Sequence, residues 1–227
     1  MKKRIGVVLS GCGVQDGSEI HEATLTLLAL DRADAEIVCM APDRPQADVV
    51  DHLTGNPTGE ARNVLRESAR IARGRIQDLA KVTPGDLDGV VLPGGYGAAK
   101  NLCTFAKDGA TCTVDPGTAR LLRGMQEVGK PIAALCISPT ILAALFGRDL
   151  HPEITIGNDP GTAKALETMG AKHTQASPTE VVVDRRHRLI TTPCYMSTTR
   201  IRDVAAGIEG AVKALLAMTE ESTSARA

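Results

Sequence analysis

Short apolar runs alternate with helical segments along most of this chain, and that alternation restricts the fold more than any other feature. Four runs have the length and composition of buried parallel strands, namely Ile5–Ser10, Glu36–Met40, Asp88–Leu92 and Pro131–Leu135. Helical patterns cover Ile20–Leu30, Glu60–Arg73, Asp115–Val128, Pro139–Phe146 and Thr198–Met218. Strands and helices that alternate at this spacing form βαβ units. We therefore predict an α/β fold, with a doubly wound, mostly parallel sheet and helices on both faces.

The remaining segments extend this prediction. Further strands are expected at Ile154–Ile156, Glu180–Asp184 and Leu189–Thr192, the last two joined by a charged turn. The segment Asp43–Gly59 is polar and interrupted by proline and glycine, which indicates an excursion from the sheet. No internal repeat or clear linker divides the chain. We predict a single domain over residues 1–218 and a disordered C-terminal tail over residues 219–227.

The charges of the chain nearly cancel, since 26 lysines and arginines face 27 aspartates and glutamates. Such a chain has no excess of positive charge to attract nucleic acid or an anionic membrane surface, so we expect neither partner. The apolar run behind Met1–Arg4 is too short for a signal peptide, and no later run is long enough to span a bilayer. Six cysteines without a CxxC pair indicate reduced thiols and a cytoplasmic location.

Three loops at one edge of the predicted sheet carry residues suited to chemistry. Ligands of an open α/β sheet bind beyond the carboxyl ends of the strands. The loops there contain Gly11-Cys12-Gly13 followed by Glu19, then Pro93-Gly94-Gly95, and finally Cys136. Together they supply a thiol, a carboxyl group and bare backbone N–H groups to one pocket.

Cys136 is the strongest candidate for a reactive group. It stands directly between a predicted strand and a predicted helix, where the helix N-terminus favours thiolate over thiol. Its small neighbours, Ala133-Ala134 and Ser138-Pro139, permit a strained turn. The alternative is a small buried hydrophobe, because cysteine is among the most buried residue types. Gly94 and Gly95 could present N–H groups to an oxyanion, with the Ile137 N–H as partner donor.

Glu19 is the carboxyl expected to lie over this thiol. Two negative charges held close together are costly, so a carboxyl and a thiolate share one proton. A protonated Glu19 could hydrogen-bond the sulfur and later move protons on a substrate. Glu22 follows three residues later on nearly the same helix face and is the second candidate. A solvated first-turn acid, favoured by the helix dipole, is the structural alternative for Glu19.

Other chemistries fit the sequence less well. The glycines of residues 11–17 miss the dinucleotide-binding spacing by one residue, and the cysteine spacings match no zinc template. No histidine is predicted near Cys136: His21 should point away from Glu19, His151 and His187 fall elsewhere, and the sequence does not place His52. Ile137 directly follows the candidate nucleophile. These observations argue against NAD binding, a metal site, and protease or amidotransferase chemistry.

Several motifs resemble a known family. The stretches Val90–Gly95, Ala98–Leu102 and Ala133–Pro139 look like the DJ-1/PfpI superfamily. More narrowly, Ser10–Gly13, Asp16–Glu22, His52–Gly55, Arg62–Leu65 and Thr191–Pro193 resemble the ElbB-type glyoxalases. The resemblance runs from Lys3 to about Leu216.

The resemblance implies a flavodoxin-like, class I glutamine amidotransferase-like fold, often homodimeric, with no metal and no cofactor. The family's nucleophilic cysteine maps onto Cys136, its protonated glutamate onto Glu19 and its oxyanion-hole glycine onto Gly95. We also expect Cys12 and Asn101 to contact the oxyanion or the substrate. Two family histidines are replaced here, one by the Asn158-Asp159 or Cys194-Tyr195 region and the other by Ile137.

The activity implied is that of a glutathione-independent, glyoxalase III-type lyase acting on a small aldehyde or dicarbonyl. It would convert glyoxal or methylglyoxal and water into glycolate or lactate through a Cys136 hemithioacetal. The alternative is a thiol-based redox sensor or a small-carbonyl binding protein with little turnover, in which Cys12 or Cys194 could resolve an oxidised Cys136. A chaperone-like role is supported only by the family resemblance.

Overall fold

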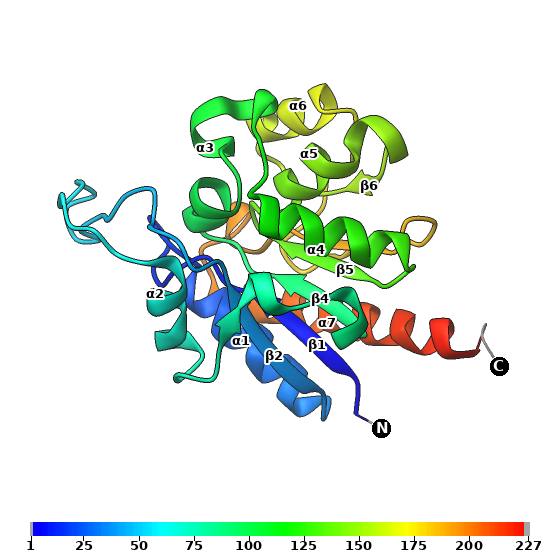
Figure 1. The fold of residues 1–227 in the computed structure, drawn as a ribbon. Helices are drawn as coiled ribbons and strands as arrows, with labels where there is room; N and C mark the ends of the chain where they lie inside the picture. Colours follow the sequence, from blue (N-terminus) through cyan, green and yellow to red (C-terminus); the bar gives the residue numbers. More distant parts are fainter. Residues whose placement is uncertain (1, 225–227) are drawn as a thin grey trace.

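A seven-stranded sheet forms the centre of the molecule in the computed structural model, which describes residues 2–224 (Figure 1). Its order is β3-β2-β1-β4-β5-β9-β8. The strands are β1 (Arg4–Val8), β2 (Glu36–Ala41), β3 (Gln77–Asp78), β4 (Gly89–Leu92), β5 (Ile132–Leu135), β8 (Val182–Asp184) and β9 (Leu189–Thr192). All pairs are parallel except β8 with β9. The predicted doubly wound, mostly parallel α/β fold is confirmed.

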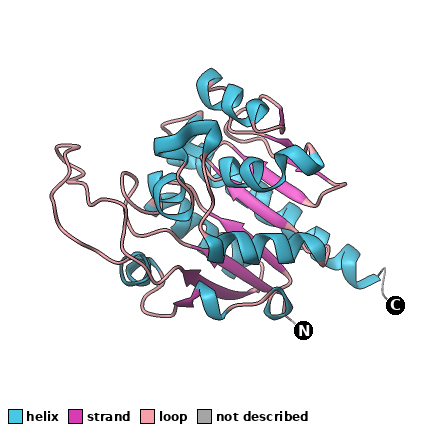
Figure 2. Cartoon of the chain, turned by 45° about the horizontal axis from the view of Figure 1, so that its top comes forward, coloured by secondary structure: helices cyan, strands magenta, loops and turns pink. Residues whose placement is uncertain are grey.

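Helices cover both faces of this sheet (Figure 2). One face packs against α1 (Ile20–Arg32), α2 (Val64–Ile71) and α7 (Ile201–Ser224). The other packs against α4 (Pro116–Glu127) and α5 (Pro139–Leu150), together with the 3₁₀ turn η1 (Leu79–Lys81). A second 3₁₀ turn, η2 (Pro84–Asp86), contacts α4. Because both faces are covered, β4, β5 and β9 are buried along their whole length. This explains why β4 and β5 appear in the sequence as continuous apolar runs rather than alternating ones.

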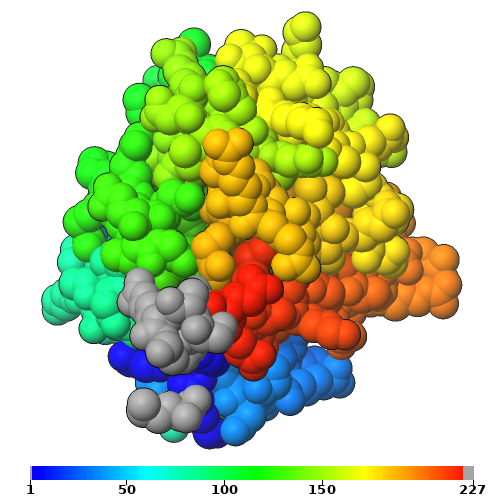
Figure 3. Space-filling model, turned by 90° about the vertical axis from the view of Figure 1, so that its right-hand side faces the viewer, coloured from blue at the N-terminus to red at the C-terminus, as the bar shows by residue number. Residues whose placement is uncertain are grey.

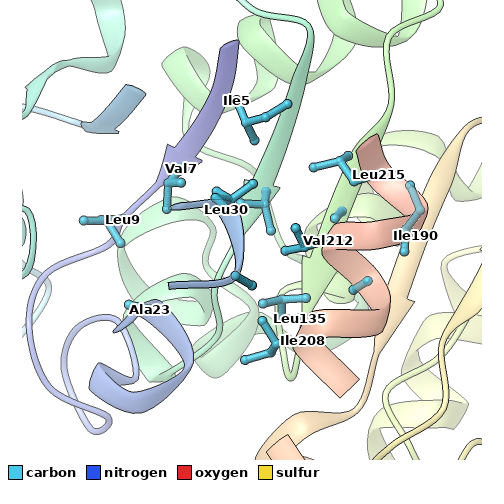
Figure 4. Close-up of a cluster of buried hydrophobic side chains, with 14 of the residues drawn as sticks. Ile5, Val7, Leu9, Ala23, Leu30, Leu135, Ile190, Ile208, Val212 and Leu215 are labelled. Atoms are coloured by element: carbon cyan, nitrogen blue, oxygen red, sulfur yellow. The ribbon is translucent and has the colours of Figure 1, made fainter. Parts of the chain in front are cut away.

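The core on the α1 and α7 side is built almost entirely from aliphatic side chains (Figure 4). Ile5 and Val7 of β1, Leu135 of β5, and Ile208 and Val212 of α7 meet there with little or no solvent exposure. Burial of such side chains contributes roughly 1.5–3 kcal/mol each. The carboxyl ends of β1, β4 and β5 are therefore held rigidly side by side, which fixes the loops that follow them.

Several elements differ from the sequence-based prediction. The strand expected at Ile154–Ile156 is β6 (Glu153–Ile154), which pairs with β7 (Lys172–His173) in a separate two-stranded sheet. A helix that the pattern did not indicate, α6 (Pro160–Thr168), lies between them in sequence. The excursion at residues 43–59 is an extended loop that reaches away from the body of the molecule (Figure 1). Within the described residues, no helix is both long and apolar enough to cross a bilayer.

The prediction of a disordered tail from residue 219 is wrong for the part that the structure describes. Helix α7 continues through Ser224, because no glycine or proline interrupts it after Met218. Its last turns lie beside the N-terminal strand on the surface shown in Figure 3, and Lys3 Nζ donates to the Thr219 carbonyl there (3.4 Å). Residues 225–227 of the predicted tail lie outside the described residues.

Candidate active site

Cys136 occupies a strained turn between β5 and α5. Its φ is +57°, in the left-handed region that residues other than glycine rarely adopt. Three hydrogen bonds hold this turn. The Cys136 N–H donates to the Thr192 carbonyl (3.0 Å), the Ser138 N–H to the Leu135 carbonyl (2.9 Å), and the Ser138 hydroxyl to the Pro93 carbonyl (2.8 Å). The turn has the geometry of a nucleophile elbow, in which the side chain projects beyond the end of the sheet.

The two glycines after β4 allow the other loops to approach this turn. A Cβ on Gly94 would stand 2.4 Å from the Cys136 Cβ and 2.6 Å from Glu22 Oε2. Gly95 has a φ of +96°, and a Cβ there would lie 2.3 Å from the Glu19 nitrogen. No side chain fits at either position. The two glycines of the Pro-Gly-Gly sequence therefore allow three loops to pack closely around the thiol.

The carboxyl that contacts the Cys136 thiol is that of Glu22, which is fully buried. Glu22 Oε2 also accepts a hydrogen bond from the Gly94 N–H (2.9 Å). Glu19, which we expected in this place, is instead the N-cap of α1, and its Oε2 accepts from the Glu22 N–H (2.7 Å). The expected position of Glu19 is corrected: α1 begins at Ile20, as predicted, and Glu19 is the residue that caps it. Its side chain therefore turns back onto its own helix.

Burial controls the electrostatics of this pair. Removal from water, followed by the nearby charge of Glu19, raises the pKa of Glu22 to about 7. Burial, followed by the negative charge of Glu22, raises the pKa of the Cys136 thiol well above its ordinary value. The expected lowering of the thiol pKa by the helix N-terminus is therefore outweighed. Near neutral pH the pair holds one or two protons, and a thiolate forms only when its proton passes to Glu22.

Two backbone N–H groups also point at the sulfur. Those of Gly95 and Ile137 hydrogen-bond the Cys136 side chain and favour its charged form. Donors in this position can also stabilise an oxyanion formed on a carbon bonded to the sulfur. The Gly94 N–H, by contrast, is already directed to Glu22. The N–H groups of Gly95 and Ile137, but not that of Gly94, therefore face the sulfur.

Cys136 opens onto a cavity of about 390 Å³. Loops and helix ends from several parts of the chain line it, with Val14, Gly95, Tyr96, Ala99, Phe105, Ala106, Cys136, Ile137, Asp159, Thr162, Tyr195 and Met196 contributing. Three of the four aromatic residues of the chain, Tyr96, Phe105 and Tyr195, gather at this one place. The thiol is only 7% exposed but is reachable from this cavity.

The sequence did not indicate the contact between Tyr195, which lines this cavity, and His21 beside it. Tyr195 follows β9, its N–H donates to Glu22 Oε1 (3.4 Å), and its hydroxyl lies 2.8 Å from His21 Nδ1. His21, which we expected to point away from Glu19, has Nδ1 3.8 Å from Glu19 Oε1. The signal was available for Tyr195, because a residue just after a parallel strand lies at the same sheet edge as Cys136.

Cys12 and Asn101 do not line this cavity in the described part of the chain. The Asn101 side chain donates to the carbonyls of Ser10 and Asp16 (both 2.9 Å) and accepts from the Ala47 N–H (2.8 Å). It therefore ties the first loop to the base of the excursion, and this placement argues against a substrate contact.

Among residues 2–224, no three His, Cys, Asp or Glu side chains gather as a metal site would require.

Comparison with known proteins identifies the family. Residues 12–196, which are most of the chain, match the DJ-1/PfpI family. The chain belongs to this family. A crystal structure described as an isoprenoid biosynthesis protein with an amidotransferase-like domain, from Ehrlichia chaffeensis, matches with a TM-score of 0.88 and 36% identity over 94% of this chain and 99% of that one. This supports the class I glutamine amidotransferase-like fold. Drosophila melanogaster DJ-1beta shares the fold at 20% identity, with a TM-score of 0.58, covering 99% of this chain and 97% of that one.

Curated relatives of this DJ-1/PfpI chain include two mammalian proteins. Human glutamine amidotransferase-like class 1 domain-containing protein 3, mitochondrial, is 45% identical over 95% of this chain and 83% of its own length. The rat ES1 protein homolog, mitochondrial, is 44% identical over 96% and 85%. These mitochondrial names contradict the expected cytoplasmic location. The expectation was based on the cysteine pattern, which does not distinguish one reducing compartment from another. The homodimer stays a prediction.

Glu22→Gln is expected to stabilise the folded protein at neutral and alkaline pH. A glutamate whose pKa rises from 4.5 unfolded to about 7 folded holds its proton more tightly in the folded state. Wild-type stability therefore falls as pH rises through this window, whereas glutamine cannot ionise. The stability difference between variant and wild type should grow by about 3 kcal/mol from pH ~4.5 to pH ~8, measured by urea unfolding. An equal difference at both pH values would contradict the buried, titrating carboxyl.

Proposed function

We propose that this DJ-1/PfpI protein is a cofactor-independent glyoxalase, converting glyoxal or methylglyoxal and water into glycolate or lactate without glutathione. One observation carries the proposal. The buried carboxyl of Glu22 is hydrogen-bonded to the thiol of Cys136, and this thiol borders the cavity. A thiol and a carboxyl that share a proton are the two groups that this reaction needs, one as nucleophile and one as proton carrier.

In the first step the Cys136 sulfur adds to the aldehyde carbon. The carbon–sulfur bond forms as Glu22 takes the thiol proton, and the carbonyl electron pair moves to oxygen. The N–H groups of Gly95 and Ile137 would hold this oxyanion. Return of the proton from Glu22 to the oxygen gives a neutral hemithioacetal. The site carries one negative charge throughout, first on Glu22, then on the oxyanion and again on Glu22, so two negative charges never stand together there.

In the second step Glu22, again a carboxylate, removes the hydrogen on the hemithioacetal carbon. The electron pair flows to the neighbouring carbonyl oxygen, giving an enediolate. Glu22 then returns the proton to that neighbouring carbon, while the hemithioacetal hydroxyl proton passes to the neighbouring oxygen. The product is a thioester of the hydroxy acid on Cys136. Water then adds to the thioester carbon, the carbon–sulfur bond breaks and the thiol is restored. One molecule of dicarbonyl and one of water give one hydroxy acid.

Variants of Cys136, Glu22 and Glu19 test these roles through the rate of glycolate formation from glyoxal. Cys136→Ala should reduce turnover to background, and Glu22→Gln should lower it by about 100-fold or more. Glu19→Gln should lose less than about tenfold, because an amide oxygen can still cap α1. Cys12→Ser, whose side chain lies outside the cavity lining, is the matched thiol control and should stay near wild type.

Two outcomes would overturn this assignment. Equal activity in the wild type and in Cys136→Ala would remove the nucleophile from the mechanism. A loss in Glu19→Gln as large as that in Glu22→Gln would show that the carboxyl touching the thiol is not the specific proton carrier.

The pH dependence of kcat/KM provides a separate test. The reactive form of the pair holds one proton, and it forms when the doubly protonated pair loses a proton near the pKa of Glu22, about 7. The rate with subsaturating glyoxal should therefore rise about tenfold per pH unit below that value and level off above it. Glu22→Gln should lose this inflection. A flat wild-type profile between pH ~5 and pH ~8 would exclude a titrating Glu22 in the free enzyme.

A thiol-based redox sensor is the second candidate, and one observation favours it. The buried Cys194 thiol lies against the backbone of Cys136, at the start of η5 (Cys194–Met196), so a resolving thiol is close. Intact-mass analysis after mild peroxide treatment separates the two functions. A stable oxidised Cys136 together with absent glyoxal turnover would favour the sensor, and rapid turnover with an unmodified Cys136 would favour the enzyme.

A further inference from the structure

A second pair of cysteines lies in the segment between β4 and α4, apart from Cys136. Cys103 directly follows the π-helical turn η3 (Ala98–Leu102), and Cys112 follows the 3₁₀ turn η4 (Gly109–Thr111). Between them the chain forms the short helix α3 (Phe105–Asp108) and returns. The two cysteines are therefore the ends of a small closed loop.

Backbone hydrogen bonds hold the two ends of this loop together. The Thr104 N–H donates to the Thr113 carbonyl (2.9 Å), and the Asp115 N–H donates to the Leu102 carbonyl (2.8 Å). The Thr113 N–H donates to the Thr104 hydroxyl (3.0 Å). These bonds flank both cysteines, so the separation of the two thiols is set by the fold and not by chance encounters of a mobile loop.

The two thiols lie close enough to interact, and neither is in a disulfide: Cys103 pairs across the loop with Val114, two residues after Cys112. Cys103 is only 3% exposed and its sulfur donates to the Ala98 carbonyl (3.4 Å), whereas Cys112 is partly exposed. The nearby Cys103 thiol lowers the pKa of the Cys112 thiol, and accordingly the pKa of Cys103 is raised. Cys112 is thus the more accessible and the more readily ionised of the two, which are the properties that decide reactivity toward oxidants.

We propose that Cys103 and Cys112 form a reversible disulfide when the protein meets a peroxide. The Cys112 thiolate attacks one peroxide oxygen, an S–O bond forms, the O–O bond breaks, and the released oxygen leaves as water after taking a proton. The Cys103 sulfur then attacks the Cys112 sulfenic acid. The S–S bond forms as the S–O bond breaks, and the hydroxyl leaves with the Cys103 proton as a second water. Both thiols are oxidised and one peroxide is reduced to two waters.

This site is independent of the proposed glyoxalase activity but lies next to the cavity. Phe105 and Ala106, inside the loop that the disulfide would close, form part of the cavity wall. Cys112, Ala163 of α6 and Met196, another lining residue, pack against the same small apolar cluster. Oxidation would therefore restrain one wall of the cavity without using Cys136.

Peptide mapping of the full chain tests the proposal directly. Reduced protein is treated with hydrogen peroxide, its remaining thiols are alkylated, and it is digested with trypsin. Cleavage after Lys100, Lys107 and Arg120 places the two cysteines on separate peptides, residues 101–107 and 108–120. We expect these peptides to appear joined, lighter by two hydrogen atoms than their sum, and to separate after treatment with dithiothreitol.

Three variants make the result specific. Cys112→Ser should abolish the joined peptides, and because Cys112 is partly exposed this variant should fold. Cys12→Ser, also at a partly exposed cysteine, should retain them. Cys136→Ala should retain them as well, so a failure of the glyoxalase mechanism leaves this test unaffected. Oxidation of Cys112 to sulfinic acid without joined peptides, or a disulfide of Cys103 with a different cysteine, would overturn the proposal.

Discussion

The contact between the Glu22 carboxyl and the Cys136 thiol is the constraint on which the rest of the site depends. Both groups are buried, and two negative charges in that position would cost several kcal/mol each without compensation. The pair must therefore keep a proton, and the surrounding structure is arranged around that requirement. The N–H groups of Gly94 and Tyr195 satisfy the carboxyl oxygens, while those of Gly95 and Ile137 face the sulfur.

This contact in turn depends on backbone geometry that few residue types allow. Cys136 holds a positive φ, and the Gly94 backbone passes so close to it that a single methyl group would collide with both partners. The hydrogen bond from the Glu19 N–H to the Gly94 carbonyl (2.9 Å) fixes the start of α1 against the same loop. The reactive pair is thus positioned by the ends of β1, β4 and β5, whose relative placement is set by the aliphatic core beneath them.

Most of the fold and about half of the candidate site could be predicted from the sequence. Buried parallel strands ending in glycine, proline or Cys136 were recognisable, because a sheet covered on both faces leaves continuous apolar runs. The choice between Glu19 and Glu22 was not, because the helix start at Ile20 was predicted but not that the Glu19 carboxyl would cap it and leave Glu22 to face the thiol. The thiol pKa was also misjudged, because a helix N-terminus is visible in sequence whereas the degree of burial is a tertiary property. The wall formed by Asp159 and Thr162 was missed with α6, a nine-residue helix with a weak apolar pattern.

The charges around the cavity set what can enter it. Hydrogen bonds from the Thr162 N–H and hydroxyl hold the pKa of Asp159 below its ordinary value, so this lining residue is a carboxylate at neutral pH. The carboxyls of Glu22 and nearby Glu19 lie behind the thiol. No lysine or arginine is among the described lining residues. An anionic substrate would meet only like charge in a site of low dielectric constant, where repulsion is poorly screened. In the proposed reaction, a small neutral carbonyl compound meets no such barrier, and negative charge develops on it only after it has bonded to sulfur, next to the two N–H groups that face the thiol.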